Sequence, residues 1–279
     1  MTSDHWIKWL PEKGAIDSSY GRLIVYAEGF VRGFVDELIK SGGPGLTQKF
    51  LRDMCASVDI DIPNQGEFHW DDFESILDKN IGPFEKVDNV PNELKKWDGS
   101  SRRLMFQNNI PIKLWPVLMV KALMDSAEES LSERGARSII GHASWRAGRQ
   151  FGEVLGGVWG WDTREKIFNT IGEIMTPWFR NMGWGLLKIK VDEANDLIAF
   201  IFKHAYEAEA RGKDSQMTIA RNQIEGVGDY LASLEKLTSK SKEYALGDAG
   251  DTRVIMVKLH KLGDDVDMDT EPWKKLVGV

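Results

Sequence analysis

Alternating apolar and lysine side chains at residues 187–191 place the tightest limit on the fold of this chain. This alternation is typical of a β-strand with one buried and one solvated face. A polar turn at Asp192–Asp196 and an almost continuous apolar run at Leu197–Phe202 extend the strand into a predicted hairpin. A helical pattern over Gln216–Leu237 and a second hairpin within Tyr244–Leu259 follow. With helices upstream, this order predicts an α+β fold in which helices pack on one face of an antiparallel sheet.

Apolar residues at helical spacing predict five helices before the first hairpin. They cover Ser18–Lys40, Thr47–Ser57, Pro116–Gly135, Ala136–Leu155 and the segment from the capping-box pair Asp162 and Glu165 to Pro177. In the fourth of these helices Gly148 and Gly152 lie four residues apart, so bare backbone is available there for the close approach of another element.

Two stretches are expected to be irregular. Residues Asp59–Asn109 hold several prolines and glycines with little periodicity apart from a short helical pattern at Asp71–Leu77. A connection of that length is usually functional or lies over a partner. The last residues include Asp265, Asp267, Asp269 and Glu271, which follow the first ligands of a calcium loop but not its glycine or final glutamate. A solvated acidic tail is the favoured interpretation.

Composition excludes several classes of protein. A net charge of −7 over 279 residues argues against a nucleic-acid-binding surface spread over the whole chain. The single cysteine, Cys55, excludes an internal disulfide framework and is expected to be a free buried thiol. No apolar run approaches the ~20 residues of a membrane span, and no signal peptide is recognisable. A cytoplasmic protein without a membrane partner is expected.

No catalytic or cofactor motif is recognisable. The five histidines are scattered, and no nucleophile elbow, phosphate loop or dinucleotide fingerprint occurs. The sequence therefore predicts no catalytic residue, no metal ligand and no cofactor, although an enzymatic role stays open.

Aromatic residues carry more information, because eleven tryptophans are many for a chain of this size. A concentration of them between the fourth helix and the first hairpin suits the wall of a pocket for a small hydrophobic or aromatic molecule. The alternative is that they only fill a core or an interface. The residues assigned to the pocket are Trp145, Trp178, Phe179, Trp184, Phe200 and Phe202.

Three segments within Arg134–Leu262 resemble the 4-vinyl reductase domain, a small-molecule-binding fold related to haem-NO-binding and Bet3-type trafficking domains. These segments are Ser144–Glu153, Phe200–Glu209 and the closing pattern Glu243-x-x-Leu246-x-x-x-Gly250-Asp251-x-x-Val254. The upstream helix Leu114–Glu133 looks like the one that precedes this domain in phenol- and xylene-responsive regulators.

The resemblance implies a sensor-type domain without its metal. Some members of the family bind zinc through cysteines whose places are taken here by Leu246 and Val254, with another near Arg221. Leucine and valine cannot ligate a metal, so apolar packing is expected to fill the zinc site. A pocket histidine and tryptophan of the aromatic sensors fall on Asn181 and Phe202, which adds Asn181 to the expected ligand-binding residues.

Three regions are thus expected: 1–103, mainly helical with a long irregular segment; 104–262, the 4-vinyl-reductase-like domain; and 263–279, the acidic tail. The favoured function is a sensor-like binding protein without its own output domain. A non-catalytic accessory subunit of a larger enzyme complex and a reductase of tetrapyrrole or aromatic substrates remain alternatives. The resemblance also implies a homodimer or a complex subunit.

Overall fold

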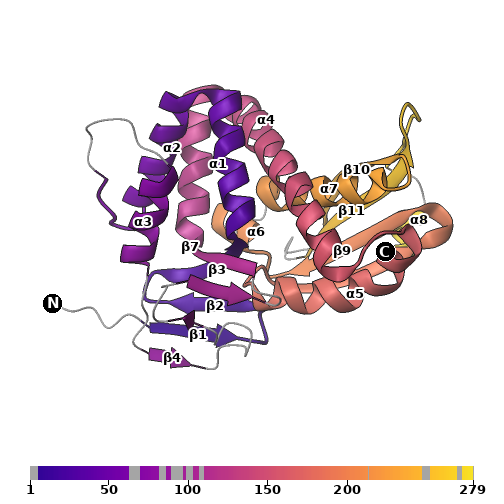
Figure 1. The fold of residues 1–279 in the computed structure, drawn as a ribbon, viewed down its shortest axis with the longest axis horizontal. Helices are drawn as coiled ribbons and strands as arrows, with labels where there is room; N and C mark the ends of the chain where they lie inside the picture. Colours follow the sequence, from indigo (N-terminus) through magenta and orange to yellow (C-terminus); the bar gives the residue numbers. More distant parts are fainter. Residues whose placement is uncertain are drawn as a thin grey trace.

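The computed structural model describes residues 6–62, 70–81, 86–88, 97–98, 103–106, 110–212, 214–246, 252–268 and 272–278. Two sheets lie at opposite sides of the molecule, and a long bent helix runs between them (Figure 1). The α+β class predicted from the sequence is confirmed. Among the described residues no helix combines the length and the apolar character needed to cross a membrane.

The first sheet is built from the N-terminal region and has the strand order β4-β1-β2-β3-β7-β6-β5. Neighbouring strands are antiparallel except for β1 and β4, which are parallel. The strands are β1 (Trp6–Leu10), β2 (Ala15–Ser18), β3 (Gly21–Ala27), β4 (Lys86–Asp88), β5 (Trp97–Asp98), β6 (Arg103–Phe106) and β7 (Ile110–Pro116). Region 1–103, which the sequence predicted to be mainly helical, therefore contributes most strands of this sheet beside its helices.

The segment Ser18–Lys40, which was predicted to be one helix, contains a strand followed by a helix. β3 occupies its first part, and α1 begins only at Glu28 and ends at Gly42. Residues 23–27 are all buried, so both faces of β3 are covered and the apolar run lacks the alternation that would have identified a strand. The helices α2 (Pro44–Ala56) and α3 (Trp70–Asn80) agree with the predictions for those segments.

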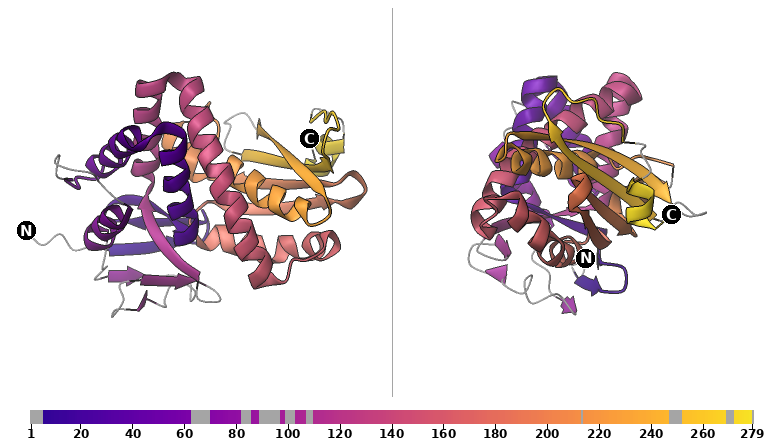
Figure 2. Two further views of the ribbon diagram at one scale, coloured as in Figure 1. Left: turned by 45° about the horizontal axis from the view of Figure 1, so that its top comes forward. Right: turned by 90° about the vertical axis from the view of Figure 1, so that its right-hand side faces the viewer.

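Helix α4 (Val117–Trp159) is bent back on itself at Ser132, which has φ 72° and ψ 160° (Figure 2). The sequence predicted a helix end at Gly135, three residues later. The first arm packs on α2, where Lys49 contacts Ser126, and the second arm packs on α1 and on α7 (Thr218–Ser233). A Cβ on Gly148 would fall within 3.0 Å of the Gln223 backbone, and one on Gly152 would touch Tyr230. The predicted close approach at these two glycines is confirmed.

The C-terminal sheet has the order β10-β11-β9-β8 and is antiparallel throughout. Its two hairpins and the helix between them were all predicted. The elements are α5 (Arg164–Asn181), β8 (Leu186–Asp192), the 3₁₀ helix η2 (Glu193–Asn195), β9 (Leu197–Lys203), α6 (Tyr206–Arg211), α7, β10 (Leu237–Leu246) and β11 (Thr252–Lys261). Helix α5 continues four residues beyond Pro177, where the sequence predicted its end.

The closing hairpin places Leu246 and Val254, the two strand positions assigned to zinc cysteines, on one face of the sheet. Glu243 pairs with Ile255, which lies in the main core under α7, whereas Val254 pairs with Tyr244. Val254 and Leu246 pack in a second apolar cluster on the other face of the sheet. Because side chains alternate along a strand, Glu243 and Leu246 point to opposite faces. Leu246 and Val254 therefore have apolar neighbours, whereas Glu243 lies on the opposite face of the sheet; Gly250 and Asp251 lie outside the described residues.

The sequence suggested a solvated acidic tail, but part of the tail is buried against the second sheet. After an exposed turn at Leu262–Gly263 it returns over the outer face of the second sheet and ends in the short helix α8 (Pro272–Val277). Met268 and Trp273 are buried there against the second apolar cluster.

Candidate functional site

A narrow apolar cavity of about 40 Å³ lies between α5, α7, the second sheet and the inner end of β3. Helix α5 supplies one wall through residues that share one helical face. These are Ile167, Phe168, Ile171, Met175, Trp178 and Phe179. Thr163 accepts a hydrogen bond from the Lys166 N–H and so caps the start of this helix. The opposite wall comes from α7 and from β9 and β11.

Gln223 is the polar group of this wall with the most to gain from a ligand. Its side chain is buried (6% exposed) on α7, and its Oε1 has no hydrogen-bond partner among the described residues. An unpaired buried acceptor typically costs about 1–3 kcal/mol. A molecule in the cavity with a hydrogen-bond donor would remove that cost.

Charged groups stand at one end of the cavity. Glu235 accepts a hydrogen bond from the backbone N–H of Arg164, and both residues line the cavity. The Arg164 guanidinium forms an ion pair with Asp196 at 2.9 Å and lies 5.0 Å from the centre of the Phe168 ring. Because Arg164 and Asp196 are each about one-third exposed, this end is the one nearest to solvent.

Four of the seven residues predicted to bind a ligand line the cavity: Trp178, Phe179, Trp184 and Phe200. Phe202 is fully buried behind them and contacts the Phe179 ring at 5.9 Å. Trp145 and Asn181 are only half-buried and do not line the cavity. The sequence analysis missed Gln223 and the α5 face, although the α5 face could have been found from its helical spacing.

Behind the aromatic wall, the cavity reaches the junction of the two sheets. Trp184 donates its Nε1–H to the Val25 carbonyl oxygen at 3.0 Å, and its ring packs edge-on against Tyr26 and Tyr206. The hydroxyl groups of the two tyrosines share a hydrogen bond, and burial raises the pKa of each well above its ordinary value. Both phenols therefore stay protonated at neutral pH.

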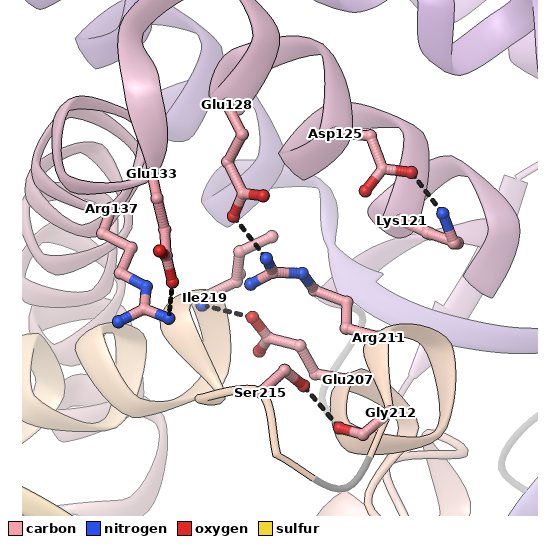
Figure 3. A network of polar contacts seen from close by, with 10 residues as sticks. All are labelled: Lys121, Asp125, Glu128, Glu133, Arg137, Glu207, Arg211, Gly212, Ser215 and Ile219. Carbon is pink, nitrogen blue, oxygen red and sulfur yellow. Dashed lines mark hydrogen bonds and ion pairs between the residues drawn. The ribbon is translucent and has the colours of Figure 1, made fainter.

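A polar network holds the start of α7, the helix that carries Gln223 (Figure 3). Glu207, which is fully buried on α6, accepts hydrogen bonds from the backbone N–H groups of Ile219 and Ala220. Arg211, on the same helix, forms an ion pair with Glu128 of α4. Carboxylates are favourable at a helix N-terminus, because the first N–H groups have no partner within the helix.

Burial, with a smaller contribution from the nearby Glu243, raises the pKa of Glu207 to about 7, although the two N–H groups and Arg211 act in the opposite direction. Glu243, on β10, accepts a hydrogen bond from the backbone N–H of Met217. Its Oε1 lies 3.5 Å from Nη1 of Arg253. The glutamate of the closing pattern therefore has structural partners in this chain. Among the described residues no group of three potential metal ligands comes together.

A six-membered ring does not fit the cavity. An apolar cavity of about 150 Å³ is known to accept benzene, which is several times the space found here. A tetrapyrrole is larger still, so the same limit applies to the reductase alternative.

No family model and no curated protein matches this chain. Solved structures that are similar to it are H-NOX proteins. The Fe(II) unliganded H-NOX protein from K. algicida has a TM-score of 0.42 and 8% sequence identity, over 85% of this chain and 98% of that one. A mutant of the T. Tengcongensis H-NOX has a TM-score of 0.41 and 11% identity, over 87% and 100%.

Haem, which is named with another of the similar H-NOX structures, does not fit the described residues. His142 and His204 are exposed, and His260 pairs with Thr238 on the outer face of the sheet, so none of the three lines the cavity. The cavity volume also excludes a porphyrin. His5 and His69 lie outside the described residues.

Two expectations are corrected by these comparisons. The similar structures are H-NOX proteins and not 4-vinyl reductase domains, so the resemblance stated from the sequence is not upheld. The small hydrophobic or aromatic partner is likewise not upheld, and the cavity volume gives the physical reason. Dimerisation and membership of a complex remain predictions, as does an accessory-subunit role.

Proposed function

We propose that this chain is a sensor-type binding domain whose cavity takes one uncharged molecule of two or three non-hydrogen atoms with a hydrogen-bond donor. The observation that carries the proposal is that Gln223, a residue of the cavity wall, has a buried Oε1 without a partner among the described residues. The donor of the ligand would point to this oxygen, and the rest of the molecule would touch the apolar wall.

The size limit follows from the cavity volume. A cavity needs about 10–15 Å³ of this kind of volume to hold one water molecule. The 40 Å³ found here therefore corresponds to about three water-sized positions. Methanol and ethanol have the required size and donor, whereas longer alcohols exceed the space.

The same size limit restricts the affinity. The very best small ligands gain about 1.5 kcal/mol per non-hydrogen atom. Three atoms then give at most about 4.5 kcal/mol, which corresponds to a dissociation constant on the order of 0.5 mM or weaker. Below that concentration the occupancy rises in proportion to the ligand, as a graded sensor requires.

The test is a titration with methanol, ethanol, 1-propanol and 1-butanol, followed by amide chemical shifts of α5 and α7. Saturable shifts in the millimolar range are expected for the first two alcohols and are expected to decline beyond three non-hydrogen atoms. Ala232→Leu, which fills the cavity from α7, should abolish them.

Gln223→Leu keeps most of the side-chain volume but removes the acceptor. It should weaken alcohol binding several-fold and leave the binding of xenon, which has no donor, unchanged. Xenon pressure on the wild type provides the matched control for access to the cavity. Shifts that never saturate, or that survive Ala232→Leu, would show that the cavity is only part of the core.

A further inference from the structure

The outer face of the second sheet combines lysines with apolar side chains. The pairing places Lys190, Ala199, Met256 and Lys242 in one row across the four strands. The next row contains Asp192, Leu197, Lys258 and Lys240, so three of the four strands carry a charged side chain there and one of these is acidic. Lys188 and Lys203 lie on the same face by the alternation of their strands. The face therefore has an apolar centre and a net positive charge, with Asp192 as the acidic residue among these rows.

The C-terminal tail lies on this face in the way a bound peptide would. The sheet recognises its backbone: Lys240 donates to the Val266 carbonyl oxygen at 2.8 Å, and Lys190 donates to that of Leu276 at 2.8 Å. Tyr244 donates its hydroxyl proton to the Met268 carbonyl oxygen at 2.5 Å. Contacts to backbone oxygens do not depend on the side chains of the segment that is bound.

Two side chains anchor the tail. Met268 and Trp273 are each only 8% exposed, and the Trp273 ring stacks on Tyr244 with ring centres 4.0 Å apart. The tail from Gly263 to Val279 contains five acidic and two basic residues, so its charge complements the lysines below. Apolar anchors and complementary charge are the usual components of peptide recognition.

The tail fits this face imperfectly. A space of about 70 Å³ remains between Met268, Trp273 and the sheet residues Leu197 and Met256. The Trp273 Nε1–H is buried without an acceptor among the described residues, which typically costs about 1–3 kcal/mol. The turn that leads into the tail is open, since Leu262 is 88% exposed. The tail can therefore leave without disturbing β11.

We propose that this face is a docking site for an acidic peptide segment of a partner protein, with two apolar anchors five residues apart, and that the chain's own tail occupies it as an intramolecular competitor. A tethered segment acts at an effective concentration in the millimolar range. To displace the tail, a partner segment must fill the space beneath the anchors better than Met268 and Trp273 do. Otherwise it can bind only after the tail has left the face.

The experiment uses the full chain and a fluorescein-labelled synthetic peptide with the sequence of residues 263–279. Met268→Ala with Trp273→Ala loosens the tail in the protein, and this double variant should bind the peptide at least tenfold more tightly than the wild type. Adding Lys190→Glu and Lys240→Glu to the loosened variant should abolish binding. Lys236→Glu, an exposed lysine outside this face, is the control for the change in net charge.

Hydrogen exchange of the unmodified protein gives a second measurement that does not depend on the folding of a variant. Excess unlabelled peptide should speed amide exchange in residues 264–277 and leave β11 protected. The proposal is overturned if the peptide binds neither protein, if it binds both equally, or if Lys236→Glu weakens binding as much as the substitutions in the face. A protein with an unmodified tail that dimerises by exchanging tails would assign the face to a second copy instead of a partner protein, and would overturn the proposal.

Discussion

The hydroxyl oxygens of Tyr26 and Tyr206 lie 2.5 Å apart in the interior, and their hydrogen bond joins β3 of the first sheet to α6 beside the second. Both rings pack against Trp184, which lines the cavity. The residue after Tyr206 is Glu207, which holds the start of α7. The junction of the two sheets, the cavity and the helix that carries Gln223 are thus connected through adjacent residues.

Tyr26→Phe or Tyr206→Phe should each lower the free energy of unfolding by about 1–3 kcal/mol, because either change leaves the other buried hydroxyl without its partner. The double variant should lose clearly less than the sum of the two single losses. Urea unfolding of the four proteins measures this coupling. Strictly additive losses would show that the two hydroxyl groups do not depend on each other.

Gly226→Ala should destabilise the protein by about 1–3 kcal/mol or more. A Cβ at this position would lie closer than 3.0 Å to the backbone oxygen of Trp145 and to the backbone nitrogen of Arg149, so α4 and α7 would have to separate. Gly172→Ala is the matched control, since nothing lies within 4 Å of its added Cβ. The control should raise the midpoint of thermal unfolding, because alanine is the better helix former by up to about 1 kcal/mol.

Ser132→Gly should raise the free energy of unfolding by up to about 1 kcal/mol. Ser132 has φ 72° and ψ 160° at the bend of α4, a backbone region that is costly for every residue except glycine. Ser130→Gly, two residues earlier in regular helix, should instead lower the free energy of unfolding. Chemical denaturation of both variants checks the prediction, which fails if the two substitutions act alike.

The pH dependence of stability should include a contribution from Glu207. Its pKa is about 7 in the folded chain, against an ordinary value of 4.5. Between these pH values the folded chain binds more protons than the unfolded chain, so the free energy of unfolding falls as pH rises. The contribution is complete below about pH 4.5 and is lost above about pH 7. A shift of this size corresponds to a change on the order of 3 kcal/mol.

Glu207→Gln removes this titration, so the stability difference between the wild type and the variant should fall across the same pH window. Glu225 and Glu243, whose pKa values are also raised by burial, are present in both proteins and cancel. Glu165→Gln, an exposed carboxyl on α5, is the control for the loss of one carboxyl group. Guanidinium unfolding at several pH values measures the difference, and a flat profile would contradict the assignment.

Sequence periodicity was sufficient to predict the type of element where one face of a segment is exposed to solvent. The alternation at residues 187–191 predicted β8, and the helical spacing from Gln216 predicted α7, because each pattern follows directly from the geometry of its element. Cys55 is free and buried, as expected, and burial raises its pKa to about 12. The opposite orientation of Glu243 and Leu246 also follows from the sequence, since three residues along a strand reverse the face.

Other features depended on contacts between distant segments. β3 is covered on both faces by elements far away in the sequence, so its buried run from Leu23 has no local sign that separates strand from helix. The unpaired Gln223 oxygen arises only where α7 meets the cavity, and the position of Trp273 depends on a sheet face that is built from four strands. The local pattern of side chains determined which element forms where one face of the segment is exposed to solvent. The packing of remote elements against one another decided where the cavity lies and what covers the second sheet.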